Sequence, residues 1–253
     1  MIPRRARSAV VALCGVASLG ILATSCSSST TAAPSASGAT LIAQARMAAQ
    51  QAGSVSYSVR AGTQATKANP KPAVESLTAQ ISAPASAQSI RMSSGSGNLD
   101  VIFTGGTAYV RGDAYTLYYA LAMTHDNAAK YAGQWISIRP TDTPYNQIAQ
   151  TFTIDGTISS FLPQGTPLIV GKPTKLDGIE TTPVTGRAPA NSTLKSGVLR
   201  VYLSNRTHLP VGSGIVGLSS SGARNSEVVK FLSWGHPVNV TAPQGAVPYS
   251  SIA

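Results

Sequence analysis

The chain has 253 residues, a formal net charge of +10, 43% hydrophobic side chains and two cysteines. The basic residues are scattered without a dense run, which argues against a nucleic-acid-binding protein. Cys14 lies in an N-terminal apolar segment and Cys26 just after it, so the rest of the chain can form no internal disulfide.

Residues 1–25 have the pattern of an export signal. Arg4, Arg5 and Arg7 form a basic start, and residues 9–24 form an apolar core that is too short for a comfortable membrane-spanning helix. The segment Leu-Ala-Thr-Ser-Cys ending at Cys26 resembles a bacterial lipoprotein box, in which the cysteine sulfur is acylated and becomes the new N-terminus. We therefore expect an exported lipoprotein, anchored through Cys26 at the outer face of the plasma membrane.

Residues 26–38 are rich in Ser, Thr and Ala and predict a flexible tether. Residues 39–253 suffice for a single domain with a sizeable core. Loss of the signal leaves 16 basic and 9 acidic side chains, a net charge of +7. This balance fits either a mild attraction to anionic lipid headgroups or simple solubility.

The first element of the domain is predicted to be a helix over residues 41–52. Thr40 fits an N-cap and Gly53 a stop. Leu, Ile and Ala form one apolar stripe along this segment, which predicts close packing against a sheet. Strands are expected next at residues 55–60, 75–82 and 88–93, with a loop over 63–72.

Residues 98–113 predict a β-hairpin. Two strand-like runs, 99–103 and 107–111, flank Gly105-Gly106, a pair that tolerates the positive φ angles of a tight turn. Side chains alternate along a strand, so Leu99, Val101 and Phe103 share one face. The sheet should therefore have one clearly apolar face.

Residues 114–124 favour a helix, with a buried strand as the alternative. A strand is expected at 134–139, followed by helices at 144–152 and 154–162, the first capped by Thr143. Further strands are predicted at 168–172, 179–185, 198–204, 211–218 and 227–234. No regular βαβ alternation occurs, so the fold class is α+β with a largely antiparallel meander.

Sequence signals of catalysis are weak. The G-x-G-x-x-G string at 212–217 is not followed by a good helix start, so we interpret it as strand glycines rather than a cofactor site. The three histidines are too far apart for a helical metal motif. Asp100 with Asp113, and Asp177 with Glu180, fit turn and surface roles. We expect no enzyme, no cofactor and no metal site.

Short strings in the chain resemble one family of lipoproteins. They are Gly-Thr-Ala-Tyr-Val-Arg-Gly at 106–112, Gln-Trp-Ile-Ser-Ile at 134–138, Leu-Pro-Val at 209–211 and Trp-Gly-His-Pro-Val-Asn-Val-Thr-Ala-Pro at 234–243. With the lipoprotein box and tether, they are similar to the actinobacterial lipoproteins typified by mycobacterial LppX and LprG, and more distantly to the LolA/LolB carriers. The resemblance implies an incomplete antiparallel β-barrel (half-barrel) wrapped around an N-terminal helix and short middle helices, with an apolar cavity between them. Members of that family bind or move lipids and lipoglycans.

The resulting hypothesis is a membrane-anchored protein that binds or carries a lipid or lipoglycan, possible partners being a membrane transporter and the membrane itself. Individually the predicted lining side chains also fit an ordinary core, so the hypothesis concerns the set. The predicted lining is Leu99, Val101, Phe103, Leu117, Leu121, Leu199, Val201 and Leu203. The alternative is a non-carrier lipoprotein that acts as a protein-binding scaffold for a transporter or sensor, because a half-barrel can also fill itself with side chains.

Overall fold

The computed structural model describes residues 36–64, 73–82, 86–92, 97–189, 196–218 and 222–252. The predicted export signal, the predicted acylation site Cys26 and nearly all of the predicted tether lie outside these ranges, as does most of the loop predicted at 63–72. The described residues belong to one unit that starts at Ala36. Within them, no helix combines the length and the apolar character needed to cross a membrane.

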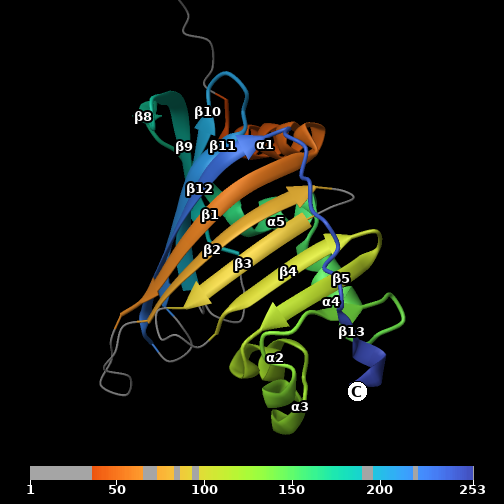
Figure 1. The fold of residues 1–253 in the computed structure, drawn as a ribbon. Helices are drawn as coiled ribbons and strands as arrows, with labels where there is room; N and C mark the ends of the chain where they lie inside the picture. Colours follow the sequence, from red (N-terminus) through yellow and green to blue (C-terminus); the bar gives the residue numbers. More distant parts are fainter. Residues whose placement is uncertain are drawn as a thin grey trace, which may run out of the picture. The chain divides into compact units, whose positions relative to one another are not determined.

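In the part of the chain that the structure describes, thirteen strands form one open sheet in the order β13-β6-β5-β4-β3-β2-β1-β12-β11-β10-β9-β7, and β8 pairs with β9 (Figure 1). The strands are β1 (Ser54–Thr63), β2 (Ala73–Ser82), β3 (Ser86–Met92), β4 (Leu99–Thr104), β5 (Thr107–Gly112), β6 (Ile136–Ile138), β7 (Gln164–Val170), β8 (Thr174–Leu176), β9 (Ile179–Arg187), β10 (Ser196–Ser204), β11 (Pro210–Leu218), β12 (Arg224–Trp234) and β13 (Val247–Pro248). Pairing is antiparallel except between β13 and β6. The edge strands are β7 and β8, which both pair with β9, and β13 at the other end; β7 and β13 each contain a proline, and β8 has three residues.

One longer helix and several short helices accompany the sheet, which confirms the predicted α+β half-barrel. The helices are α1 (Gly38–Ala52), α2 (Ala114–Ala120), α3 (His125–Lys130), α4 (Tyr145–Thr151), α5 (Ile154–Phe161) and the 3-10 turn η1 (Tyr249–Ser251). In Figure 1, α5 lies behind β1, β2 and β3. The viewer therefore sees the face of the sheet that is opposite to α5. We call the helix-covered side the inner face and the opposite side the outer face.

The predicted hairpin is confirmed as β4 and β5. Leu99 pairs with Gly112 and Thr104 with Thr107. Gly105 and Gly106 connect the strands with φ angles of 58° and 70°, values that residues with a Cβ rarely adopt. The turn therefore fixes the register of the two strands, and this register places the apolar side chains of β4 on the inner face.

The N-terminal helix begins earlier than predicted, so Thr40 is not its N-cap. Ser37 caps α1 instead, since its hydroxyl accepts a hydrogen bond from the Thr40 backbone N–H at 3.1 Å. A Cβ on Gly38 would meet the Cβ of Leu168 at 2.7 Å, so the first turn of α1 lies directly against β7. Gly53 ends the helix in the left-handed conformation, as predicted.

The middle helices differ from the prediction in their ends. Residues 114–124 contain the helix that was favoured, but α2 stops at Ala120. Thr143 does not cap α4, because Pro144 holds the N-cap position and no side chain bonds there. The unpredicted helix α3 starts where Thr124 accepts from the Asn127 backbone N–H. The glycines at 212–217 lie in β11, as interpreted.

Two hydrophobic clusters fill the inner face. The first joins β1, β2, β4, β5, β6 and β12 to α2–α5 and η1, and it holds most of the aromatic rings. The second joins β9, β10 and β11 to α1 and α5, and it is built from Ala, Leu, Ile and Val. The first cluster is therefore capped mainly by short helices and the second mainly by the long one.

Candidate functional site

The predicted lining residues divide between the two clusters. Leu99, Val101, Phe103, Leu117 and Leu121 belong to the first, and Leu199, Val201 and Leu203 belong to the second. Leu117 and all three residues of the second cluster have exposures of 0–1%. Water does not reach these side chains, so they are packed by neighbouring side chains. Leu99 and Phe103 are only half-buried.

A cavity of about 270 Å³ opens at the rim of the first cluster. Leu99 and Glu75 line it from the sheet, and α2 contributes Tyr115 and Tyr119. The two tyrosines are 55% and 67% exposed, and their ring centroids are 4.8 Å apart. The rim therefore combines half-covered apolar surface with aromatic side chains that reach solvent. We call this opening the rim cavity.

Two carboxylates point to the inner face near this end of the sheet. Glu75 on β2 and Glu227 on β12 both pair with Ala61 of β1, one from each side. Burial raises the pKa of both side chains, and the charge of Glu75 raises that of Glu227 further. Each carboxylate therefore gives up its charge more readily than an exposed glutamate.

The polar character continues inward from Glu227. Burial raises the pKa of Tyr57 to about 12, the Thr157 hydroxyl opposes that shift, and the Glu227 carboxylate adds to it. Ser213 on β11 is 4% exposed, and its buried hydroxyl has no hydrogen-bond partner among the described residues. A seam of polar side chains thus runs between the two apolar clusters.

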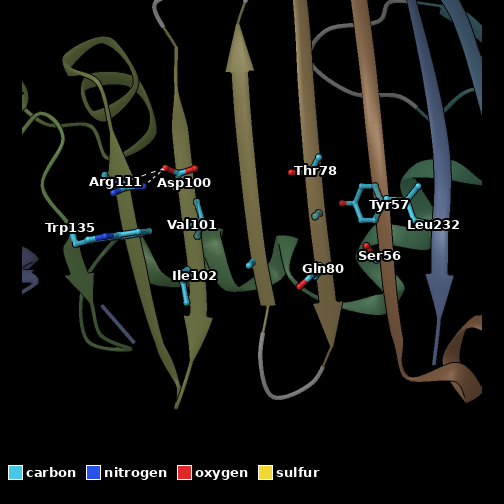
Figure 2. Close-up of a pocket in the computed structure, with 12 residues that line it drawn as sticks. Ser56, Tyr57, Thr78, Gln80, Asp100, Val101, Ile102, Arg111, Trp135 and Leu232 are labelled. Atoms are coloured by element: carbon cyan, nitrogen blue, oxygen red, sulfur yellow. Dashed lines mark hydrogen bonds and ion pairs between the residues drawn. The ribbon is translucent and has the colours of Figure 1, made fainter. Parts of the chain in front are cut away.

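A second cavity, of about 430 Å³, lies on the outer face (Figure 2). We call it the outer groove. Its volume is within the range of small-molecule sites. Trp135, Ile102 and Leu232 supply apolar surface, and Arg111 bonds Asp100 at 2.9 Å. The Arg111 guanidinium also lies 4.7 Å from the centre of the Trp135 ring.

The other candidate carboxylates have structural partners. Asp113 caps α2 and accepts from the backbone N–H groups of Gly97, Asn98 and Thr116. Partial burial alone would raise the pKa of Asp113, but these hydrogen bonds and one from the Thr116 hydroxyl outweigh it and lower the pKa. Asp177 and Glu180 do not pair with each other; they pair with Lys230 and Lys175 on the surface. Turn and surface roles are confirmed for these residues.

Metal-ligating side chains do not gather anywhere in the described ranges, where no group of three or more His, Cys, Asp or Glu could hold an ion. His125 stacks on Tyr118 with ring centroids 4.0 Å apart. The carbonyl of His236 accepts a hydrogen bond from the Ser54 hydroxyl. These two histidines therefore serve local packing and hydrogen bonding.

Sequence reasoning missed the Glu75–Glu227 pair, although a signal existed. Glu75 lies two residues before Leu77, and Glu227 lies two residues before Val229. Residues two apart share a face of a strand, so each carboxylate occupies an inner-face position. Their proximity depends on β12 pairing with β1, which are far apart in the sequence. The outer groove was also missed, because it is built from the polar-side positions of several strands.

Comparisons with known proteins identify no family. No family model matches the chain, and no curated protein matches it. A chain of the Pseudomonas aeruginosa MucA/MucB complex is 13% identical with a TM-score of 0.34. The match covers 80% of the present chain and 58% of the Pseudomonas chain, so the present chain spans less than three fifths of the length of the Pseudomonas chain.

Two other solved structures match more of their own length. An uncharacterized conserved protein from Thermus thermophilus is 10% identical with a TM-score of 0.39, covering 81% of this chain and 97% of that one. A LolA superfamily protein from Nitrosomonas europaea is 9% identical with a TM-score of 0.31, covering 81% and 96%. Likenesses this weak carry no statement about function.

Proposed function

We propose that this chain is an exported lipoprotein, anchored through acylated Cys26 at the outer face of the plasma membrane, that binds an acyl chain of a lipid or lipoglycan at the rim cavity. One observation carries the proposal. The inner face changes from sealed side chains around Leu199 to a half-covered apolar rim at Leu99 with an adjoining cavity. The lipoprotein box and the short strings quoted above support the same function.

The driving force is removal of apolar surface from water. Each methylene of an acyl chain gains about 0.8 kcal/mol in an apolar site, so about fifteen methylenes face roughly 12 kcal/mol on entering water. Leu99 and the rings of Tyr115 and Tyr119 offer apolar contact at the entrance. The Glu75 carboxylate would repel an anionic headgroup there, so we expect the acyl end to enter first.

The experiment is a titration of the delipidated chain with fatty acids of increasing length. Affinity should rise about fourfold for each added methylene until the site is filled, and then level off. Lipids retained by the purified chain, identified by mass spectrometry, should be stoichiometric. A chain that retains no lipid and shows no dependence on acyl length would contradict the proposal.

A matched pair of variants locates the site. Leu99→Gln places an amide at the rim cavity and should weaken acyl binding several-fold. Ile179→Gln makes the same change at a residue that is 45% exposed on β9 and should leave binding unchanged. Equal acyl-chain affinities in the two variants would mean that the acyl chain does not bind at the rim cavity.

The second candidate function is a protein-binding scaffold for a transporter or sensor. The outer groove favours it, because Trp135 and Ile102 offer an aromatic and an aliphatic anchor beside the Arg111–Asp100 pair. Crosslinking in the native envelope from the outer groove, through a photoreactive residue at Ile102, should then trap a protein partner. For both candidates we propose a non-catalytic role, which a screen for hydrolase activity checks.

A further inference from the structure

The outer face of β9, β10, β11, β12 and β1 carries exposed cations among exposed aliphatic side chains. We call this surface the basic outer face. The aliphatic members Val198, Val216, Leu218 and Val228 are 44–56% exposed. The cations are Arg60, Arg187, Arg200, Arg224 and Lys230, all of them exposed. Contiguous exposed apolar side chains mark interaction surfaces more often than chance.

The strand register brings these side chains together. Arg60 pairs with Val228, and Arg200 lies in the same cross-strand row because both Val228 and Arg200 pair with Gly214. In the next row, Val198 pairs with both Val216 and Arg187. The two kinds of side chain are therefore interleaved across neighbouring strands.

Acidic side chains are nearly excluded from this surface. On these strands the carboxylates are Glu180 and Glu227, and both occupy inner-face positions of their strands. Asp177, in the turn before β9, reaches Lys230 at 3.4 Å, but both side chains are more than half exposed, so the pair contributes little. Arg200 donates to the neutral Thr185 hydroxyl. The positive charge is therefore not cancelled locally.

We propose that the basic outer face docks on an anionic lipid membrane. Solubility alone would not place aliphatic side chains beside the cations, whereas a bilayer interface accepts both, because cations meet headgroups and short aliphatic side chains enter the interfacial region. The proposal is independent of acyl binding at the rim cavity, which lies at the inner face.

The test measures partition of the full chain onto vesicles of phosphatidylcholine with and without 30% phosphatidylglycerol. Each cation near an anionic surface contributes about fivefold. The triple variant Arg60→Gln, Arg200→Gln, Lys230→Gln should therefore lower the phosphatidylglycerol-dependent partition roughly a hundredfold. High salt should reduce the wild-type partition toward that of the variant.

The matched control is the triple variant Lys130→Gln, Arg139→Gln, Arg206→Gln, which removes three exposed cations from α3 and from turns. It should keep the wild-type partition, and thermal melts of both variants should coincide with the wild type. The double variant Val216→Ser, Val228→Ser should weaken partition several-fold. This loss is of apolar contact, so high salt should not reproduce it.

Equal losses in the two triple variants would overturn the proposal, as would wild-type partition that ignores phosphatidylglycerol. If partition ignores phosphatidylglycerol, an acidic protein is the better partner for the basic outer face. Leu99→Gln should leave vesicle partition unchanged, so failure of acyl binding and failure of membrane docking are separate results.

Discussion

The inner face is covered in two different ways. Over β9–β11, the long helix α1 presents Ala45 and Ala49, both at 0% exposure, so its backbone lies close to the sheet. Over β4–β6, the covering helices α2, α3 and α4 have six or seven residues each and leave the rim cavity beside α2. Helix length and side-chain size therefore decide where the inner face is sealed and where a cavity is left beside it.

The largest expected effect comes from core truncation in the sealed region. Leu199→Ala should lower the free energy of unfolding by about 2–5 kcal/mol, because a fully packed site cannot collapse around the deleted atoms. Leu99→Ala, at the edge of an existing cavity, should cost only about 1 kcal/mol. Urea denaturation measures both.

Val198→Ala serves as the control, since this exposed neighbour of Leu199 should change stability by less than about 0.5 kcal/mol. Equal losses for Leu199→Ala and Leu99→Ala would mean that the two regions are packed alike.

An intermediate effect is expected where each covering helix begins. Asp113→Ala removes the cap of α2 and the bonds to Gly97 and Asn98, and it should cost about 2 kcal/mol at pH 7. The lowered pKa of Asp113 means that its contribution is complete above the ordinary Asp pKa of about 3.9 and is lost as pH falls through the folded-state pKa.

Denaturation at pH 7 and at pH 3 should therefore show the difference between Asp113→Ala and wild type shrinking in acid. Ser37→Ala, which removes the exposed cap of α1, should cost only about 0.5 kcal/mol, with no such pH dependence. A larger loss for Ser37→Ala would show that the long helix, not the short one, relies on its cap.

The smallest effect concerns the polar seam between the two regions. Glu227→Gln should stabilise the protein by about 1 kcal/mol at pH 7, which would raise Tm by about 2–4 °C, because it removes a half-buried charge that faces Glu75. The raised pKa of Glu227 means that its protonated form is favoured by folding. The advantage of the variant should therefore vanish as pH falls below the ordinary Glu pKa of about 4.3.

The control Glu180→Gln breaks an exposed pair with Lys175 at 3.3 Å and should lower stability by less than about 0.5 kcal/mol. Thermal melts at pH 7 and pH 4 distinguish the two variants. A destabilised Glu227→Gln would mean that the carboxylate has a favourable partner on the inner face.

Local sequence patterns predicted the elements well where alternation or turn chemistry was strong. The hairpin follows from period-two alternation on both sides of the Gly105-Gly106 turn, and the strand of Leu199, Val201 and Leu203 follows from alternation alone. Helix starts were less predictable, because Ser37 and Thr40 both have capping hydroxyls; in the fold Ser37 caps α1, and Gly38 in its first turn lies against Leu168. Strands of two or three residues, such as β13, carry too little pattern to be recognised.

The candidate site was harder to predict than the fold. Alternation assigned Leu99 and Leu203 to the same inner face, but it could not tell that one would lie at a rim and the other in a sealed core. That difference depends on which helix covers each strand. Glu75 and Glu227 lie on either side of Ala61 only because β12 pairs with β1 across more than 150 positions of sequence. The role of the predicted lining as a lipid site stays a prediction.

The ends of the open sheet have a consequence for behaviour at high concentration. An uncovered border strand offers unpaired N–H and C=O groups to a second molecule, which is the usual route to edge-to-edge aggregation. Here Pro167 withholds a donor from β7 and Pro248 from β13, an irregular register between Gln164 and Ile169 interrupts β7, and the remaining edge strand, β8, has only three residues. The sheet can thus remain unclosed without recruiting further copies, and we expect a monodisperse solution at millimolar strength.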